Sequence, residues 1–164
     1  MYNVNKIKND LIQLLSRKAL VSDDTLRFLD EWIENKHEEY SYDDCKYIWS
    51  LVFNNISIDN NDSGLLYRIT NKRREGYFVS FTDNKDVINK FYFSINNAYT
   101  EKAVVLVGRK DKIKYYPLYK VIDNIVNDDL GYYISKILVN KEYECVCEDS
   151  SEIKELTIND FFDN

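Results

Sequence analysis

Apolar residues recur at helical spacing through the first third of the chain, which predicts three helices there. The apolar face of the first helix is Val4, Ile7, Leu11, Leu14 and Leu15. Ser22 is expected as the N-cap of the second helix, whose apolar stripe is Leu26, Phe28, Leu29, Trp32 and Ile33. Ser41 and Asp44 form a capping arrangement before the third helix, whose apolar face is Cys45, Ile48, Trp49, Val52 and Phe53.

The pattern changes after the polar turn "DNNDSG" at residues 59–64, where short β-branched and aromatic runs begin. These runs predict strands over 65–70, 77–82, 103–108 and 142–147, and the continuous apolar run 103–108 suits a buried central strand. Asp83 is expected to cap a helix whose core positions are Val87, Ile88 and Phe91. Pro117 restricts residues 113–122 to an edge strand or a bend. Helical spacing returns at Leu130, Tyr133, Ile134, Ile137 and Leu138, and residues 156–164 are expected as a last strand or docked segment.

Helices followed by strands predict an α+β fold. The 164 residues are enough for one domain with its own hydrophobic core. We therefore expect a single domain over residues 1–164, in which a helical N-terminal lobe, residues 1–58, packs on a mixed β-sheet core, residues 65–164.

The net charge of −6 disfavours direct nucleic-acid binding, which normally requires a basic face. The strongest basic run, Lys72-Arg73-Arg74, is interpreted as a solvated loop. No apolar run approaches the roughly 20 residues that span a bilayer, and the N-terminus lacks the apolar region of a signal peptide. The expectation is a soluble protein of the cytosol that does not interact with a membrane.

Cysteine and histidine are too scarce for several common chemistries. Cys45, Cys145 and Cys147 are too few for a disulfide framework or a closed zinc site, and Cys45 is expected as a packed core thiol. The single His37 lies among charges and is expected on the surface. A hydrolase triad is therefore disfavoured.

Polar side chains interrupt three of the predicted strands. Arg68 lies inside "LLYRIT", where it either faces solvent by alternation or anchors an anion through its guanidinium fork. Ser80 and Thr82 are two residues apart and so share a strand face, opposite Tyr77 and Phe81. That face is either solvent-exposed beside the cap at Asp83 or part of a site.

A third pair of polar residues lies near the C-terminus. Glu142 and Glu144 are expected on one strand face, roughly 7 Å apart. Tyr143, Cys145 and Cys147 would then share the opposite, inward face, so the Cys-x-Cys pattern indicates packing. The two carboxylates are either ordinary exposed surface or a catalytic pair.

Taken in order, these residues resemble the motifs of the mono-ADP-ribosyltransferases of the arginine, Ser-Thr-Ser, Glu-x-Glu class, of bacterial-toxin or phage type. Arg68 matches the arginine, Ser80-Phe81-Thr82 the Ser-Thr-Ser, and Glu142-Tyr143-Glu144 the Glu-x-Glu. The middle position of the second motif is Phe81 and the third is Thr82. The resemblance covers residues ~40–150 and implies the ADP-ribosyltransferase fold.

The resemblance implies transfer of ADP-ribose from NAD to a side chain of a host protein, with NAD as a substrate and no metal. Glu144 would stabilise the positive charge that develops on the ribose, and Glu142 would activate the acceptor. Ser80 and Thr82 would hold the carboxylate or the ribose, and Arg68 would grip the ribose and phosphate end. Tyr77 or Phe81 would stack on nicotinamide.

Two other interpretations remain open. The chain could be a non-catalytic, acidic phage or mobile-element protein that inhibits a host defence complex or nuclease by mimicking nucleic-acid charge. Alternatively, it could keep the transferase fold without its activity, with Phe81 as the departure from the motif.

Overall fold

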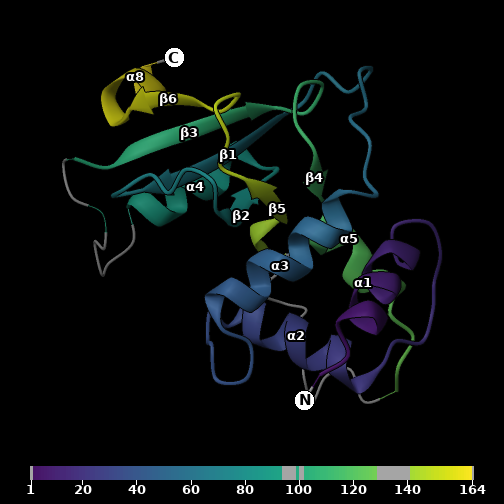
Figure 1. Cartoon of the computed structure of the whole chain (residues 1–164). Helices are drawn as coiled ribbons and strands as arrows, with labels where there is room; N and C mark the ends of the chain where they lie inside the picture. The colour runs from purple at the N-terminus through teal and green to yellow at the C-terminus, as the bar shows by residue number, and fades with distance from the viewer. Residues whose placement is uncertain (1, 94–98, 100–101, 129–140, 164) are drawn as a thin grey trace. The chain divides into compact units, whose positions relative to one another are not determined.

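The computed structural model describes residues 2–93, 99, 102–128 and 141–163 (Figure 1). Two compact units form within the chain. The helical unit comprises Met1–Ile56 and Pro117–Lys141, and the sheet unit comprises Ser57–Tyr116 and Glu142–Asn164. The first unit thus includes a later segment that the sequence pattern had assigned to the strand-rich core. The helix expected around Leu130–Leu138 lies outside the described residues.

The three predicted N-terminal helices are confirmed as α1 (Val4–Gln13), α2 (Asp23–Ile33) and α3 (Tyr42–Phe53). The predicted caps are also confirmed: the Ser22 side chain accepts from the Thr25 N–H, and Ser41 and Asp44 form a reciprocal capping box. Their apolar faces meet in a core where Phe28 and Trp49 are fully buried. Cys45 is buried in this core as expected, and His37 is exposed.

Residues 117–128 add a short helix and bonded loops to the described part of the helical unit. Helix α5 (Leu118–Val121) and a 3-10 turn (Ile122–Asn124) follow Pro117. The Asn127 side chain then pairs with Val21, its amide donating to the Val21 carbonyl and its oxygen accepting from the Val21 N–H, each at 2.9 Å. A side-chain amide thereby ties residues 117–128 to the N-terminal helices.

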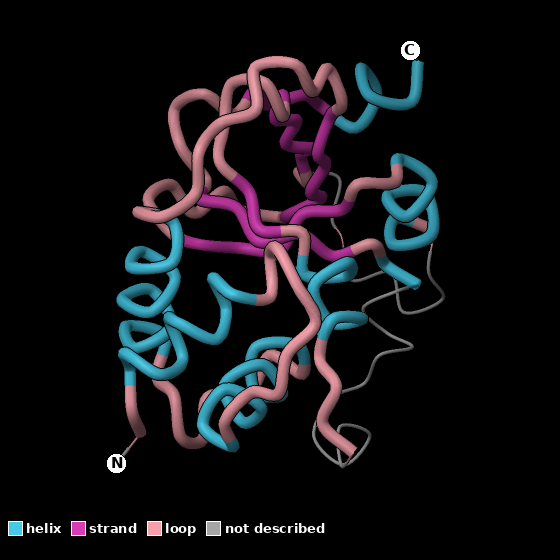
Figure 2. The backbone as a smooth tube through the Cα atoms, turned by 90° about the vertical axis from the view of Figure 1, so that its right-hand side faces the viewer, coloured by secondary structure: helices cyan, strands magenta, loops and turns pink. Residues whose placement is uncertain are grey.

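The described residues of the sheet unit form six strands, drawn in magenta in Figure 2. Their bounds are β1 Leu65–Thr70, β2 Phe78–Thr82, β3 Val104–Arg109, β4 Tyr115–Tyr116, β5 Glu144–Glu148 and β6 Lys154–Thr157. The order across the sheet is β4-β5-β2-β1-β3-β6. The inner strand expected at residues 103–108 is confirmed as β3. Residues 113–122 contain the edge strand β4, and the chain turns into helix after Pro117.

The expectation of a mixed sheet is wrong, because all five described strand pairings are antiparallel. A short connection explains part of this result. Residues 71–77 join β1 to β2, which are neighbours in the sheet. A parallel neighbour would need a crossover of a dozen residues or more.

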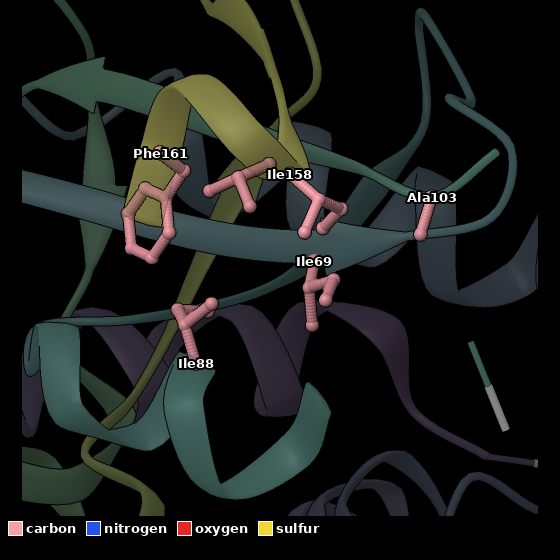
Figure 3. Close-up of a cluster of buried hydrophobic side chains, with 6 residues drawn as sticks. Ile69, Ile88, Ala103, Ile158 and Phe161 are labelled. Atoms are coloured by element: carbon pink, nitrogen blue, oxygen red, sulfur yellow. The ribbon is translucent and has the colours of Figure 1, made fainter. Parts of the chain in front are cut away.

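Two helices and the sheet enclose a hydrophobic cluster. Helix α4 (Lys85–Tyr92) supplies Ile88, and α8 (Ile158–Asp163) supplies Ile158 and Phe161. These side chains gather around Ile69 of β1 (Figure 3) and Val105 of β3. The C-terminal segment, predicted as a last strand or a docked segment, therefore begins in the edge strand β6 and continues as helix α8, which packs on the cluster.

The expected cap at Asp83 is wrong by one residue. Asn84 is the N-cap of α4, and its side chain accepts from the Asp86 N–H at 2.9 Å. Asp83 instead forms a 2.6 Å ion pair with Lys110 Nζ, which lies just after β3. Either of these two adjacent residues could cap the helix. Asn84 does so, while Asp83 is engaged in the long-range ion pair.

The basic run at residues 72–74 is not simply a solvated loop. Arg73 Nε pairs at 2.9 Å with Asp149, a side chain that is 1% exposed. Arg73 also donates to the carbonyls of Ser150 and Ile153. The turn at Gly76, whose φ of 84° suits glycine, donates its N–H to the Asp149 carbonyl at 2.8 Å. The loop before β2 is therefore tied to the segment after β5.

Truncation of the shared cluster tests this packing. Ile69→Ala is expected to lower the free energy of unfolding by about 2–4 kcal/mol, because it removes buried methyl groups from between β1, α4 and α8. The control is Leu65→Ala, at the exposed start of the same strand, with an expected loss below about 1 kcal/mol. Urea unfolding followed by circular dichroism measures both, and equal losses would contradict the assigned core.

Candidate active site

The first residue of β5, Glu144, is a buried carboxylate that bonds to β2. It is 6% exposed, and its Oε2 accepts a hydrogen bond from Ser80 Oγ at 2.8 Å. The register of the two strands explains the contact, because Thr82 pairs with Glu144 and Ser80 with Val146. Ser80 and Glu144 are thus diagonal neighbours on one face. A buried carboxylate is costly without such donors.

Arg68 extends this contact to a third strand. Its Nη1 donates to the backbone carbonyl of Ser80 at 2.9 Å, so β1 is bonded to β2 through a side chain. The two strands share a single register pair, Tyr67 with Thr82. Arg68 is partly buried and does not simply face solvent by alternation. The structure therefore brings Arg68, Ser80 and Glu144 into one bonded set.

Glu142 does not lie on the strand, which corrects the expected pair of carboxylates on one strand face. β5 begins at Glu144, Glu142 has helical conformation, and Tyr143 between them has a positive φ of 51°. Strand alternation therefore does not apply across this segment. Tyr143 is 39% exposed and not inward-facing, whereas Cys145 and Cys147 are buried as expected.

The Thr82 hydroxyl is engaged with the protein backbone. Its Oγ1 donates to the Glu142 carbonyl at 2.7 Å and accepts from the Asn84 N–H at 3.1 Å. Its side chain is 4% exposed. Thr82 thus contacts the Glu-x-Glu segment directly, but through the main chain of Glu142.

The two aromatic residues predicted to stack on nicotinamide lie away from Glu144. Phe81 is buried and pairs in register with Cys145, on the sheet face opposite Ser80 and Thr82. Tyr77 precedes β2 at the end where Phe78 pairs with Glu148, and the Arg74 guanidinium lies 5.1 Å from its ring centre. Neither position favours a role in stacking on a ligand at Glu144.

Tyr99 is an aromatic residue near the bonded set that the sequence pattern did not indicate. It packs against the cluster around Ile69. Burial raises its pKa, with a smaller opposing contribution from the Arg68 charge and an additional raising contribution from Glu142. Tyr99 therefore lies within electrostatic reach of both Arg68 and Glu142. Its neighbours in sequence have no periodic pattern from which this position could have been predicted.

The three cysteines are poor nucleophiles in this fold. Burial raises the pKa of Cys45 to about 12 and raises those of Cys145 and Cys147 above the usual range. Their reactive thiolate forms are correspondingly depleted. Among the described residues, no three His, Cys, Asp or Glu side chains are grouped so that they could hold a metal ion.

No protein-family model matches the chain, and no curated protein or solved structure matches it either. In the described part of the chain, no helix has the length and apolar character needed to cross a membrane. The contacts of the described residues are therefore the basis for any functional assignment.

Removal of the Ser80 hydroxyl tests the central contact. Ser80→Ala is expected to lower the free energy of unfolding by about 1.5–3 kcal/mol, the range for hydrogen bonds to charged groups. Ser63→Ala is the control, because Ser63 is exposed before β1. If both variants unfold at the same urea concentration, the Ser80–Glu144 contact does not stabilise the fold as described.

Thiol labelling at pH 8 tests the burial of the cysteines. The thiols of the folded chain are expected to react with a chromogenic disulfide reagent at least about 10²-fold more slowly than free cysteine, because the thiolate is the reactive form. All three thiols should react rapidly in guanidinium chloride. A thiol of the folded chain that reacts at the rate of free cysteine would show that at least one site is open.

Proposed function

We propose that this chain is an NAD-dependent mono-ADP-ribosyltransferase that modifies a host protein in the cytosol, and that its sheet unit has the ADP-ribosyltransferase fold. The observation that carries the proposal is the bonded set in which Arg68 donates to the Ser80 carbonyl and the Ser80 hydroxyl donates to Glu144. The same three residues carry the resemblance of the sequence to the family motifs. Arg68 bonds to the main chain of Ser80 and Glu144 to its side chain, and these two contacts support the proposal.

Glu144 has the chemistry required for cleavage of NAD. Breaking the bond between nicotinamide and ribose leaves an oxocarbenium-like centre, and nicotinamide departs with the electron pair of that bond. A fixed carboxylate stabilises the positive charge as it develops. The 2.8 Å bond from Ser80 fixes the orientation of the Glu144 carboxylate before substrate binds.

Arg68 and Glu142 complete the proposed reaction. The guanidinium fork of Arg68 matches phosphate oxygens, so Arg68 holds the ribose and phosphate end of NAD in this proposal. Glu142 accepts a proton from the incoming side chain as the acceptor nitrogen bonds to the anomeric carbon. The more accessible position of Glu142, compared with the buried Glu144, suits contact with a protein acceptor.

Two conservative substitutions on one strand test the proposal. Glu144→Gln is expected to lower the rate of NAD cleavage by about 10²–10³-fold, since it removes the negative charge while keeping the shape of the side chain. Glu148→Gln, at the exposed end of β5, is the matched control and should leave the rate unchanged. Nicotinamide release and transfer of radiolabelled ADP-ribose to lysate proteins measure the two half-reactions.

The acidic inhibitor makes the opposite prediction for the same variants. A non-catalytic binding protein would form its complex equally well with Glu144→Gln or Arg68→Ala and would release no nicotinamide. Wild-type protein that neither cleaves NAD nor labels a lysate protein would rule out the transferase. Cleavage that persists at the same rate in Glu144→Gln would rule out the proposed site.

A further inference from the structure

Tyr143, between the two carboxylates of the candidate site, has an unfavourable backbone conformation. Its φ of 51° lies in the left-handed region, which residues with a bulky side chain rarely adopt. Its aromatic side chain is partly exposed. Such a conformation persists when surrounding contacts hold it.

The contacts that hold Tyr143 come from the end of β2. The Thr82 hydroxyl donates to the carbonyl of Glu142 at 2.7 Å, and the Asp83 N–H donates to the carbonyl of Tyr143 at 3.2 Å. Two consecutive carbonyls around the left-handed residue are therefore bonded to the last residue of β2 and to the residue that follows it. The Thr82 hydroxyl oxygen accepts from the Asn84 N–H, and the single hydrogen of this hydroxyl is then directed at an acceptor.

Asp83, the second residue that bonds to this segment, is itself held in place by an ion pair. Lys110 Nζ forms a 2.6 Å ion pair with Asp83, and the Lys110 side chain lies 5.3 Å from the ring centre of Tyr115. Lys110 is 8% exposed and donates its backbone N–H to the Gly64 carbonyl. Its position is therefore set by the segments beside β1 and β3.

We propose that Thr82 is a positioning residue that, with Asp83, holds Tyr143 in the left-handed conformation and so sets Glu142 relative to Glu144. This inference rests on the proposed transferase function for its catalytic consequence. Ser80 holds Glu144 independently, so loss of the clamp formed by the Thr82 and Asp83 hydrogen bonds displaces Glu142 first. The clamp therefore governs transfer to an acceptor more than cleavage of NAD by water.

The substitution Thr82→Val removes the hydroxyl and keeps the shape of the side chain. Transfer of ADP-ribose to agmatine, a small guanidine acceptor, is expected to fall about tenfold, which corresponds to about 1.4 kcal/mol. NAD hydrolysis should change less than about threefold, and Thr82→Ser should restore transfer. Thr70→Val is the matched control, because the Thr70 hydroxyl also donates to a backbone carbonyl, that of Lys72 at 2.8 Å. An unchanged ratio of transfer to hydrolysis in Thr82→Val would overturn the proposal.

A second measurement needs no activity and separates this inference from the proposed function. A positive φ brings the amide and α protons of one residue close, so Tyr143 should give a strong intraresidue nuclear Overhauser effect in the wild type. The effect should weaken in Thr82→Val and persist in Thr82→Ser and Thr70→Val. An effect of equal strength in Thr82→Val would overturn the clamp even if NAD is cleaved. Its loss would support the clamp even if the wild type proved inactive.

Discussion

The buried carboxylate of Glu144 is the constraint on which the sheet unit depends. At 6% exposure, a charged group requires a hydrogen-bond donor, and Ser80 supplies one only if β2 and β5 keep the pairing of Thr82 with Glu144. A shift of one residue would turn the Ser80 hydroxyl to the opposite face of the sheet. The same register buries Phe81 beside Cys145 on that opposite face. The polar and apolar faces of these strands thus require the same alignment.

Both ends of β5 are held by residues at or close to the ends of β2. Before β5, Thr82 and Asp83 bond to the carbonyls of Glu142 and Tyr143. After β5, Asp149 exchanges backbone hydrogen bonds with Gly76 and Tyr77 and receives the Arg73 side chain. These contacts hold the two ends of β5, and the Ser80 hydrogen bond orients the Glu144 carboxylate between them. Such preorganisation is what electrostatic stabilisation of a transition state requires.

Local signals were sufficient to predict the N-terminal helices and most strands. The caps at Ser22 and Ser41 act within one helical turn, so the sequence around them contains the whole interaction. The sequence could not distinguish Asp83 from Asn84 as a cap, because the ion-pair partner of Asp83, Lys110, lies far along the chain, just after β3. Arg73 was assigned to a solvated loop for the same reason, since Asp149 is distant in sequence.

The candidate site was predicted in part. The motif resemblance selected Arg68, Ser80 and Glu144, which the fold connects. The expected position of Glu142 on a strand face is wrong, because the alternating pattern of "EYECVC" begins two residues before the strand does. The left-handed conformation of Tyr143 is accompanied by tertiary hydrogen bonds from Thr82 and Asp83, and tyrosine itself gives no signal for it. Tyr99 was missed because its proximity to Arg68 and Glu142 depends entirely on the fold.

The claim that Arg68, Ser80 and Glu144 bind NAD is tested most directly by titration of the isotope-labelled protein with a carbocyclic NAD analogue whose nicotinamide bond does not cleave. Backbone amide resonances report on every part of the chain at once and do not depend on catalysis. Saturable shifts are expected to concentrate at residues 68, 80 and 144 and their strand neighbours. Absence of saturable shifts, or shifts confined to the helical unit, would contradict it.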